Sequence, residues 1–256
     1  MKISVCIITH NEENRLPETL KSIEKIADEI IVVDSFSKDK TIEIAKSSGA
    51  RIFLKEWADY SNQKNFAISK ASFPWILSID ADERISEELR NEILTLKKTE
   101  PEEDGFFIKR KNYYLGKWIK HSGWYPDRKL RLFRKEKANW EGEYVHESLI
   151  LRGKAGKLKN NILHYSYRNI SDHVKRINSY SSLSAQKMFE ERKKSNIILA
   201  LFSIPLTFIR FYLLRGGIFD GIQGLIISIL SSVYIFLKYV KLWEMNRTKN
   251  DKSPSH

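Results

Sequence analysis

The first hundred residues alternate short apolar runs with segments whose apolar residues recur every three or four positions. Nearly continuous apolar runs are typical of strands buried on both faces, and the intervening periodicity is helical. This alternation favours an α/β fold with a mostly parallel, Rossmann-like sheet and helices on both faces. The predicted strands are Ile3–Thr9, Glu29–Asp34, Ala50–Leu54 and Trp75–Asp80, and the predicted helices are Pro17–Ala27, Thr41–Ser48, Ser61–Ala71 and Glu87–Lys97.

Beyond Gly105 the pattern becomes less regular, and it predicts strands of a partly antiparallel region followed by one long polar helix. Together with a change in charge, this shift divides the chain into segments 1–104, 105–194 and 195–256. The predicted strands are Gly105–Arg110, Lys129–Arg134 and Leu158–His164, and the helix is Ser171–Lys194.

The formal net charge of +12 is unevenly distributed along the chain. Residues 1–104 carry a net charge of −6, whereas residues 105–159 carry +10 and residues 160–256 carry +8. A basic second half indicates an anionic partner such as phosphates, nucleic acid or a membrane surface. The alternative is a positively charged face that only keeps the protein soluble.

Two apolar segments near the C-terminus, Ile197–Leu214 and Ile218–Val240, indicate a membrane partner. Pro205 interrupts the first segment, and the uninterrupted run Leu225–Leu237 is 13 residues long. A helix needs ~20 apolar residues to span a bilayer. We therefore expect a helical pair that lies in or dips into a membrane face. The alternatives are a hairpin through the bilayer and a buried pair or oligomer interface.

The N-terminus and the lone cysteine indicate where the protein works. The first apolar run gives way to His10-Asn11 without the pattern of a secretory signal, which predicts a cytoplasmic protein. Cys6 is the only cysteine and lies within that run, so we expect it to pack in the core.

Polar residues follow three of the predicted strands, at Thr9-His10-Asn11, Asp34-Ser35 and Asp80-Ala81-Asp82. Ligands of such sheets bind beyond the carboxyl ends of the strands, so these ends should line one crevice. Two carboxylates on alternate residues can bind Mg²⁺ or Mn²⁺, which would bridge the phosphates of a nucleoside diphosphate. The alternative for Asp80 and Asp82 is a solvated acidic turn.

Three further polar residues are candidates for the same crevice. Asp34 has the chemistry to accept a hydrogen bond from a base edge or a ribose hydroxyl, or to cap the turn that follows it. Gln63 and Asn65 lie on the helix before the acidic strand end, where they either face the crevice or are exposed helix residues.

Several stretches resemble known proteins. The family 2 glycosyltransferases, which have the GT-A fold, resemble this chain in ISVCIITHNEENRLPETLKSI, EIIVVDSFSKDKT and the region from SNQKNFAISKA to ILSIDADE. Bacterial lipopolysaccharide core β-1,4-glucosyltransferases, a narrower group, are similar in HSGWYPDRKLRLFRK, EYVHESL and RFYLLRGGIFDGIQGL.

The resemblance implies an inverting, metal-dependent transfer of a hexose, by default glucose, from a UDP-sugar to a lipopolysaccharide-core or other lipid-linked saccharide. Residues 1–104 would bind the nucleotide sugar and residues 105–194 the acceptor, with 195–256 as a membrane-associating tail. The partners would be the UDP-sugar, a membrane-linked glycolipid and the cytoplasmic face of the inner membrane, with no nucleic acid.

The resemblance also assigns residues to the donor and the cation. Asp34 would meet the uracil, and Asp80 and Asp82 would hold Mg²⁺ or Mn²⁺. The predicted nucleotide-sugar set is Thr9, Asn11, Glu12, Asp34, Gln63, Asn65 and Asp80.

The general base that deprotonates the acceptor hydroxyl is predicted to be Glu147, with Asp127 as the alternative. Relatives often carry Glu-Asp near a helix start in this half, and this chain has no such pair there. A base needs only one carboxylate within reach of the hydroxyl. His146 and His164 are candidate third metal ligands, although a structural role is favoured for each.

Basic and aromatic residues are candidates for acceptor or phosphate binding. Arg128, Arg131 and Arg134 recur along one predicted strand and have the geometry to bind phosphates, or else form a basic strand face. Trp124 and Tyr125 either stack on a sugar ring or close the core.

Two other classes of protein compete with a sugar transferase. A nucleotidyltransferase also uses a parallel sheet and carboxylate-bound metal, but it would need a glycine-rich loop, and THNEENRLPE has no glycine. A non-enzymatic protein that binds membranes or anionic polymers would leave Asp34, Asp80 and Asp82 unexplained.

Overall fold

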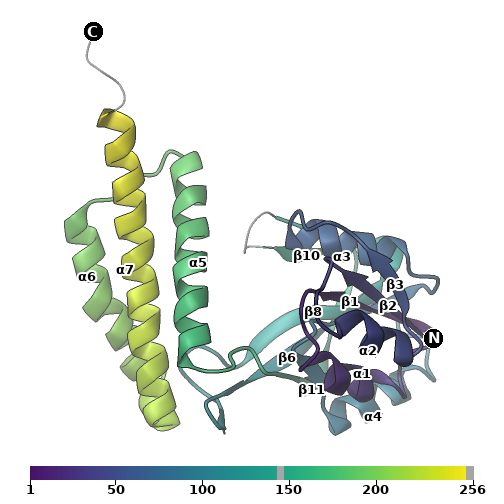
Figure 1. Ribbon diagram of the computed structural model, residues 1–256. Coiled ribbons are helices and arrows are strands. Elements are labelled where there is room, and N and C mark those ends of the chain that lie inside the picture. The colour runs from purple at the N-terminus through teal and green to yellow at the C-terminus, as the bar shows by residue number, and fades with distance from the viewer. Residues whose placement is uncertain (143–146, 252–256) are drawn as a thin grey trace. The chain divides into compact units, whose positions relative to one another are not determined.

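The computed structural model describes residues 1–142 and 147–251, with side chains through Thr248. The chain forms two compact units. The sheet unit comprises Met1–Asn112 and Pro126–Ser166, and the helical unit comprises Tyr113–Tyr125 and Tyr167–His256. These limits differ from the compositional boundaries at 104 and 194, because the sheet continues across the first and a single helical unit crosses the second (Figure 1). The roles assigned to the three segments stay predictions.

The sheet unit is built on one mixed sheet in the order β3-β2-β1-β4-β8-β6-β11-β5. The strands β1 to β4 are parallel, as predicted, and β8 joins β4 in the antiparallel direction. A separate pair of antiparallel strands joins β9 to β10. The strands are β1 (Ile3–Thr9), β2 (Glu29–Asp34), β3 (Arg51–Leu54), β4 (Trp75–Ser78), β5 (Glu83–Ile85), β6 (Gly105–Tyr114), β7 (Lys117–Trp118), β8 (Asp127–Arg134), β9 (Ala138–Glu141), β10 (Ser148–Leu151) and β11 (Ala155–His164).

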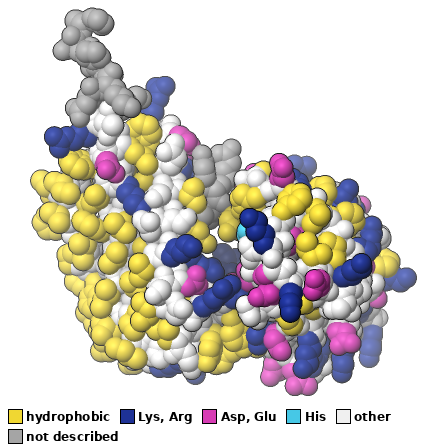
Figure 2. All heavy atoms as spheres, viewed as in Figure 1, with side chains coloured by type: hydrophobic (Ala, Val, Ile, Leu, Met, Phe, Trp, Pro, Cys, Tyr) yellow, Lys and Arg dark blue, Asp and Glu magenta, His cyan; other side chains and the backbone are white. Residues whose placement is uncertain are grey.

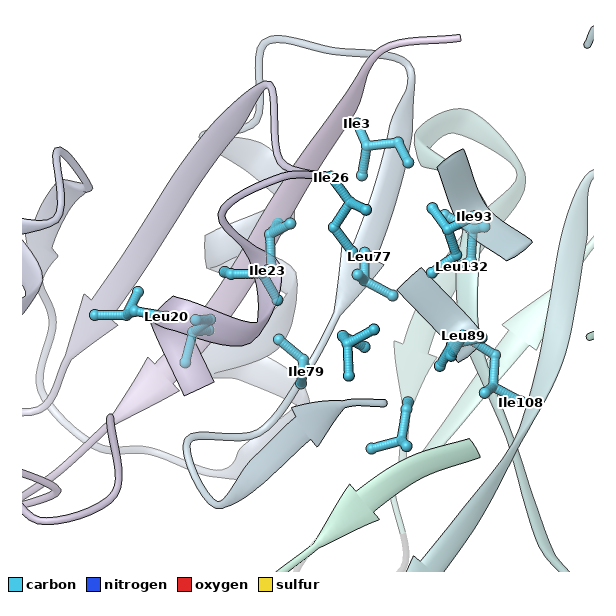
Figure 3. Close-up of a cluster of buried hydrophobic side chains, with 14 of the residues drawn as sticks. Ile3, Leu20, Ile23, Ile26, Leu77, Ile79, Leu89, Ile93, Ile108 and Leu132 are labelled. Atoms are coloured by element: carbon cyan, nitrogen blue, oxygen red, sulfur yellow. The ribbon is translucent and has the colours of Figure 1, made fainter. Parts of the chain in front are cut away.

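Helices cover both faces of the sheet because alternate strand residues point to opposite sides. On β1, Ile3, Val5 and Ile7 enter one core, shown in Figure 3, whereas Cys6 enters the other. Cys6 is therefore a buried core residue, as predicted. The helices of the sheet unit are α1 (Leu16–Ile23), α2 (Thr41–Ser47), α3 (Tyr60–Ser69) and α4 (Glu87–Leu96).

The ends of these helices follow local hydrogen bonding. Ser86 caps α4 by accepting a hydrogen bond from the backbone N–H of Leu89. Helix α1 ends before the predicted Ala27, because the N–H groups of Ile26 and Ala27 both turn back to the carbonyl of Ile23. Ile26 is nevertheless fully buried, so the apolar periodicity marks the core more reliably than the helix end.

The helical unit contains α5 (Ile170–Glu190), α6 (Ile197–Ile209) and α7 (Ile222–Asp251), and both α5 and α6 pack on α7. A π-helical segment, η2 (Arg210–Leu214), continues α6, and a short 3₁₀ segment, η3 (Gly217–Asp220), leads to α7. The predicted interruption at Pro205 is wrong, because α6 continues through it.

Two helical segments of this unit are long and apolar enough to cross a membrane, judged by length and composition alone. They are Ile197–Leu214, with a mean hydropathy of 2.1, and Ile222–Thr248, with 1.8. Both exceed the 13-residue run Leu225–Leu237, and the second continues past that run through Lys238 and Lys241.

Candidate active site

The carboxyl ends of β2, β1 and β4 lie side by side, as predicted. Thr9 at the end of β1 pairs in register with Asp34 at the end of β2. On the other side, β1 pairs with β4, and the Ile79 N–H donates to the carbonyl of Cys6 just before Asp80. The acidic turn therefore stands at the same sheet edge as Thr9 and Asp34.

The loops after β1 and β2 are tied to each other. Asn11, with a left-handed backbone (φ 55°), accepts a hydrogen bond from the Lys38 N–H at 2.8 Å through its side-chain oxygen. The Glu12 N–H donates to the Thr41 hydroxyl, also at 2.8 Å. These bonds make the loop after β1 a fixed platform at the sheet edge.

Asp34 is fully buried and forms the turn after β2. It accepts hydrogen bonds from the Thr9 hydroxyl at 2.7 Å, the Ser37 N–H at 2.7 Å and the Ser37 hydroxyl at 2.6 Å. The structure thus shows the turn-capping role of Asp34, and its contact with a base stays a prediction.

Two predicted residues on α3 have different surroundings. Gln63 is buried and donates to the Ser35 hydroxyl at 2.6 Å, while its Oε1 has no hydrogen-bond partner among the described residues. Asn65 instead binds both backbone groups of Trp140, at 2.8 and 2.9 Å. Asn65 therefore fastens β9 to α3, a role that neither sequence interpretation included.

Asp80 lies between two cationic side chains. Its Oδ2 accepts from Arg131 Nη2 at 2.6 Å, and its Oδ1 lies 3.2 Å from Lys64 Nζ. Burial alone would raise the pKa of Asp80, but the charges of Arg131 and Lys64 outweigh it and hold that pKa well below its usual range. Asp80 is therefore anionic at neutral pH.

Glu83 anchors the arginines beneath this turn. Its side chain is fully buried, and Oε1 accepts from Arg131 Nη2 at 2.7 Å and from Arg110 Nη1 at 3.3 Å. Its Oε2 accepts from the Asp80 N–H at 3.0 Å. A buried charge of this kind is retained only with close partners, so Glu83 links the acidic turn to β6 and β8.

A β-bulge places Arg131 in this cluster. Phe106 of β6 pairs with Leu132 and Phe107 with Leu130, so Arg131 is the extra residue of β8. Bulges redirect side chains and often occur beside active sites. The alternative considered for Arg128, Arg131 and Arg134, a basic strand face, does not hold, because Arg131 is buried, Arg128 is exposed and Arg134 stacks over Trp75. Phosphate binding by these arginines stays a prediction.

Asp82 faces a histidine rather than another acid. Its Oδ1 lies 3.5 Å from His164 Nε2, and its Oδ2 lies 3.5 Å from Arg15 Nη1. Burial opposes ionisation of Asp82, but His164 and Arg15 lower its pKa below the usual value. The other nitrogen of His164, Nδ1, is 2.6 Å from Asn112 Oδ1.

These residues fit a divalent cation that a diphosphate also holds. In the neutral His164 ring with Nδ1 donating to Asn112, Nε2 carries a lone pair that faces the Asp82 carboxylate. Within residues 1–142 and 147–251 no group of three or more His, Cys, Asp or Glu side chains forms a complete metal site. A cation here would take its remaining ligands from substrate phosphates, as Mg²⁺ commonly does. His146 lies outside the described residues.

The two candidate bases differ in their surroundings. Glu147 Oε1 lies 3.6 Å from Lys64 Nζ, so one lysine links it to Asp80. Asp127 instead accepts from Arg110 Nε at 2.9 Å and from Arg110 Nη2 at 2.6 Å. Burial would raise the pKa of Asp127, but Arg110 and Lys129 lower it overall, which makes Asp127 a weak base.

The predicted sugar-stacking pair belongs to the helical unit. Trp124 packs against Tyr114, Tyr167 and His173, with ring centroids 5.4 to 6.0 Å apart, so it closes an aromatic core. Tyr125 is the last residue of the same segment and is half-buried. Sugar binding by either residue stays a prediction.

Sequence reasoning did not assign site roles to Lys64, Glu83, Arg110, Asn112 and Arg15. Lys64 stands beside Gln63 and Asn65 in the quoted helix motif, and Glu83 directly follows Asp82, so both had a local signal. Arg110 and Asn112 lie on β6, whose position beside β8 and β11 is set by strand order rather than by any local pattern.

Comparison with known proteins identifies the class. Residues 4–158 match the model of "Glycosyl transferase family 2", more than half of the chain, so the chain belongs to this family and is a glycosyltransferase. The match and the sheet order confirm the predicted α/β, GT-A class, with apolar helices following the sheet.

Particular relatives lie within the same class. The chain is 31% identical to the lipopolysaccharide core biosynthesis glycosyltransferase LpsC of Rhizobium meliloti, over 97% of this chain and 94% of that protein. It is 34% identical to the uncharacterized glycosyltransferase RT0209 of Rickettsia typhi, over 96% and 88%. A crystal structure of S. aureus TarS 1–349 in complex with UDP superposes with a TM-score of 0.47 at 16% identity, over 97% and 92%.

Proposed function

We propose that this glycosyltransferase moves a hexose, by default glucose, from a UDP-sugar to a lipopolysaccharide-core or other lipid-linked saccharide, with inversion and with a divalent cation. The observation that carries the proposal is the arrangement at the strand ends. Asp82 and His164 face each other there, and Lys64 links Asp80 to Glu147.

The donor would lie along the carboxyl ends of β1, β2 and β4. The fixed loops that contain Asn11 and Glu12 offer the platform, and the buried oxygen of Gln63 is available as an acceptor. Because Asp34 is fully buried, its part would be to shape the turn against which the uracil ring of the donor lies.

Asp82 and His164 would hold Mg²⁺ or Mn²⁺, with Asp80 beside them. The cation supplies charge stabilisation to the departing diphosphate. Arg131 and Lys64 keep Asp80 ionised, so the turn retains its negative charge at neutral pH. Asn112 orients the His164 ring so that Nε2 faces Asp82.

Glu147 would accept the proton of the acceptor hydroxyl. The Glu147 side chain is one-fifth exposed. Among the described residues its one ion pair is with Lys64, at 3.6 Å. Two nitrogens of Arg110 bind Asp127 Oδ2, and Lys129 Nζ lies 3.5 Å from Oδ1, so both oxygens have cationic partners that lower the proton affinity of Asp127. The geometry therefore favours Glu147 over Asp127 as the base.

The proposed acceptor rests on likeness and on charge. The relative LpsC, matched over nearly its whole length, is named for lipopolysaccharide core biosynthesis. Residues 105–256 carry a net charge of +18, which suits a phosphorylated or membrane-bound acceptor on the cytoplasmic face of the inner membrane.

Calorimetric titration of the purified protein with a panel of nucleotide sugars, in Mn²⁺ and in chelator, tests the donor and the cation together. We expect one UDP-sugar to bind in Mn²⁺. We expect Asp82→Ala to abolish the part of this binding that depends on the cation. Asp104→Ala, an acid that pairs with Arg134 instead, is the matched control. Equal binding in chelator, or unchanged binding by Asp82→Ala, would reject the cation site.

A further inference from the structure

Helix α6 exposes apolar side chains on nearly all of its surface. Only Ala200 and Ser203 of this helix are buried. Figure 2 shows hydrophobic side chains gathered over α6 and α7. Soluble monomers rarely expose an apolar patch of this extent. The exposed residues of α6 are Ile197, Ile198, Leu199, Leu201, Phe202, Ile204, Leu206 and Ile209.

The exposure continues into the turn between α6 and α7. Leu214 and Phe219 are 79% and 75% exposed, which is unusual for large apolar side chains in a connection. Together with the exposed residues of α6, they form what we call the apolar face. The turn residues of this face are Leu213, Leu214, Ile218, Phe219 and Ile222.

The polar helix α5 and the residues just after it contact α7 between Tyr234 and Asn246. Ser184 of α5 meets the Tyr234 hydroxyl at 2.9 Å, and Lys241 Nζ donates to the Asn178 carbonyl at 2.8 Å. Asn246 donates to the carbonyl of Lys193 at 3.2 Å, just beyond α5. If α7 crossed a bilayer, α5 would have to cross with it.

Helix α5 does not have the composition of a membrane-spanning helix. Lys175, Asn178, Ser179 and Glu190 are exposed on its surface. Charged side chains facing lipid at the centre of a bilayer are strongly unfavourable. The association of α5 with α7 therefore argues against a hairpin that spans the membrane.

The turn between α6 and α7 is also bonded to residues 117–121 of the same unit. The buried carboxylate of Asp220 accepts hydrogen bonds from the N–H groups of Lys120 and His121 at 3.2 and 2.9 Å. Lys117 Nζ donates to the Asp220 carbonyl at 2.9 Å. The bonded segment lies between β6 and β8 in the chain and includes β7.

We propose that the helical unit lies in one leaflet with its helices along the membrane plane, the apolar face immersed and α5 facing water. Such immersion is typically about 5–10 Å deep. Exposed cations stand at both ends of α6 and would meet anionic headgroups. They are Arg192, Lys193 and Lys194 before α6, and Arg210 and Arg215 after it. This deepens the membrane association proposed above and is independent of donor and acceptor.

Two substitutions at equally exposed positions test which side meets the lipid. Leu199 on α6 and Val174 on α5 are both 47% exposed. In flotation with vesicles of phosphatidylethanolamine and phosphatidylglycerol, Leu199→Glu should lower affinity about tenfold or more, and Val174→Glu should leave it unchanged. Circular dichroism establishes that both variants are folded. Equal effects of the two substitutions, or none, would overturn the proposal.

A labelling experiment distinguishes the in-plane arrangement from its competitors. A thiol-reactive fluorophore is placed at Phe202→Cys or at Ser179→Cys, each in a Cys6→Ser chain. On vesicles, the label at 202 should be quenched by lipid-bound quencher, and the label at 179 by aqueous iodide. Shielding of position 179 from iodide would indicate a spanning bundle. A change in the emission of the label at 202 that depends on protein concentration, measured without vesicles, would indicate that a second copy of the chain covers the apolar face. Either result contradicts the proposal.

These assays contain no nucleotide sugar and no acceptor. A protein that binds vesicles as proposed but fails in the calorimetric titration would refute the proposed function and leave the membrane arrangement intact. The reverse result would refute the membrane arrangement alone.

Discussion

Arg131 Nη2 lies 2.7 Å from Glu83 Oε1, and both side chains are almost completely buried. Removing one partner of such a pair leaves an uncompensated charge. We expect Glu83→Gln to lower the free energy of unfolding by about 3 kcal/mol, measured by denaturant titration. Glu18→Gln, at a half-exposed residue 3.8 Å from Arg84, should cost less than about 1 kcal/mol. Similar losses of unfolding free energy in the two variants would show that the buried pair contributes no more to stability than the exposed pair.

Glu147→Gln tests the assignment of the base. The substitution keeps the shape of the side chain and removes its proton affinity, so transfer should fall about 100-fold or more while donor binding is retained. Asp127→Asn, measured in the same coupled assay, should lower stability through Arg110 and affect turnover less. Normal turnover by Glu147→Gln together with inactive Asp127→Asn would transfer the role to Asp127.

Lys64→Met tests the link between the acidic turn and Glu147. The lysine is 3.2 Å from Asp80 and 3.6 Å from Glu147, so its loss removes the charge that holds both carboxylates together. We expect transfer to fall at least about tenfold, with little change in the thermal midpoint because Arg131 still pairs with Asp80. Lys70→Met serves as the control, since Lys70 lies over the rings of Phe53 and Phe66 instead. Equal activity of the two variants would contradict the linking role.

His173 predicts a pH dependence of the helical unit. Burial lowers the pKa of His173 from 6.5 to about 4, and its Nδ1 lies 2.8 Å from the Tyr114 hydroxyl. Between these two values the unfolded chain binds a proton that the folded chain excludes, so stability decreases as the pH falls from 6.5 towards 4.

The size of this effect should be on the order of 2 kcal/mol. Hydrogen exchange of α5 amides at pH 6.5 and pH 4.5 measures it locally. His173→Gln should lose this part of the pH dependence while keeping a polar partner for Tyr114. An unchanged dependence in His173→Gln would assign it to other groups.

Local patterns predicted the sheet core well because strands that are buried on both faces are nearly continuous apolar runs in the sequence. The four parallel strands and the capping of α4 by Ser86 follow from neighbours in the chain. The meeting of Thr9, Asp34 and Asp80 follows from sheet geometry alone. These predictions needed no knowledge of how distant strands pair.

The remainder depended on contacts between segments far apart in the chain. The bulge at Arg131 exists only in the pairing of β8 with β6, so the spacing of the three arginines could not show that Arg131 is buried while Arg128 is exposed. Asn65 recognises the backbone of Trp140, 75 residues later. The pairing of Asp82 with His164 requires β11 to lie beside β5, which no local periodicity reveals.

The aromatic core of the helical unit draws on two stretches that are made at different times. Tyr114 ends β6 and Trp124 lies in the connection from β6 to β8, whereas Tyr167 and His173 follow more than forty residues later. A ribosome therefore releases the first half of this core before its counterpart exists. A chain ended after Ser166 would present Tyr114 and Trp124 without their packing partners, so no single cut in the gene yields two intact halves.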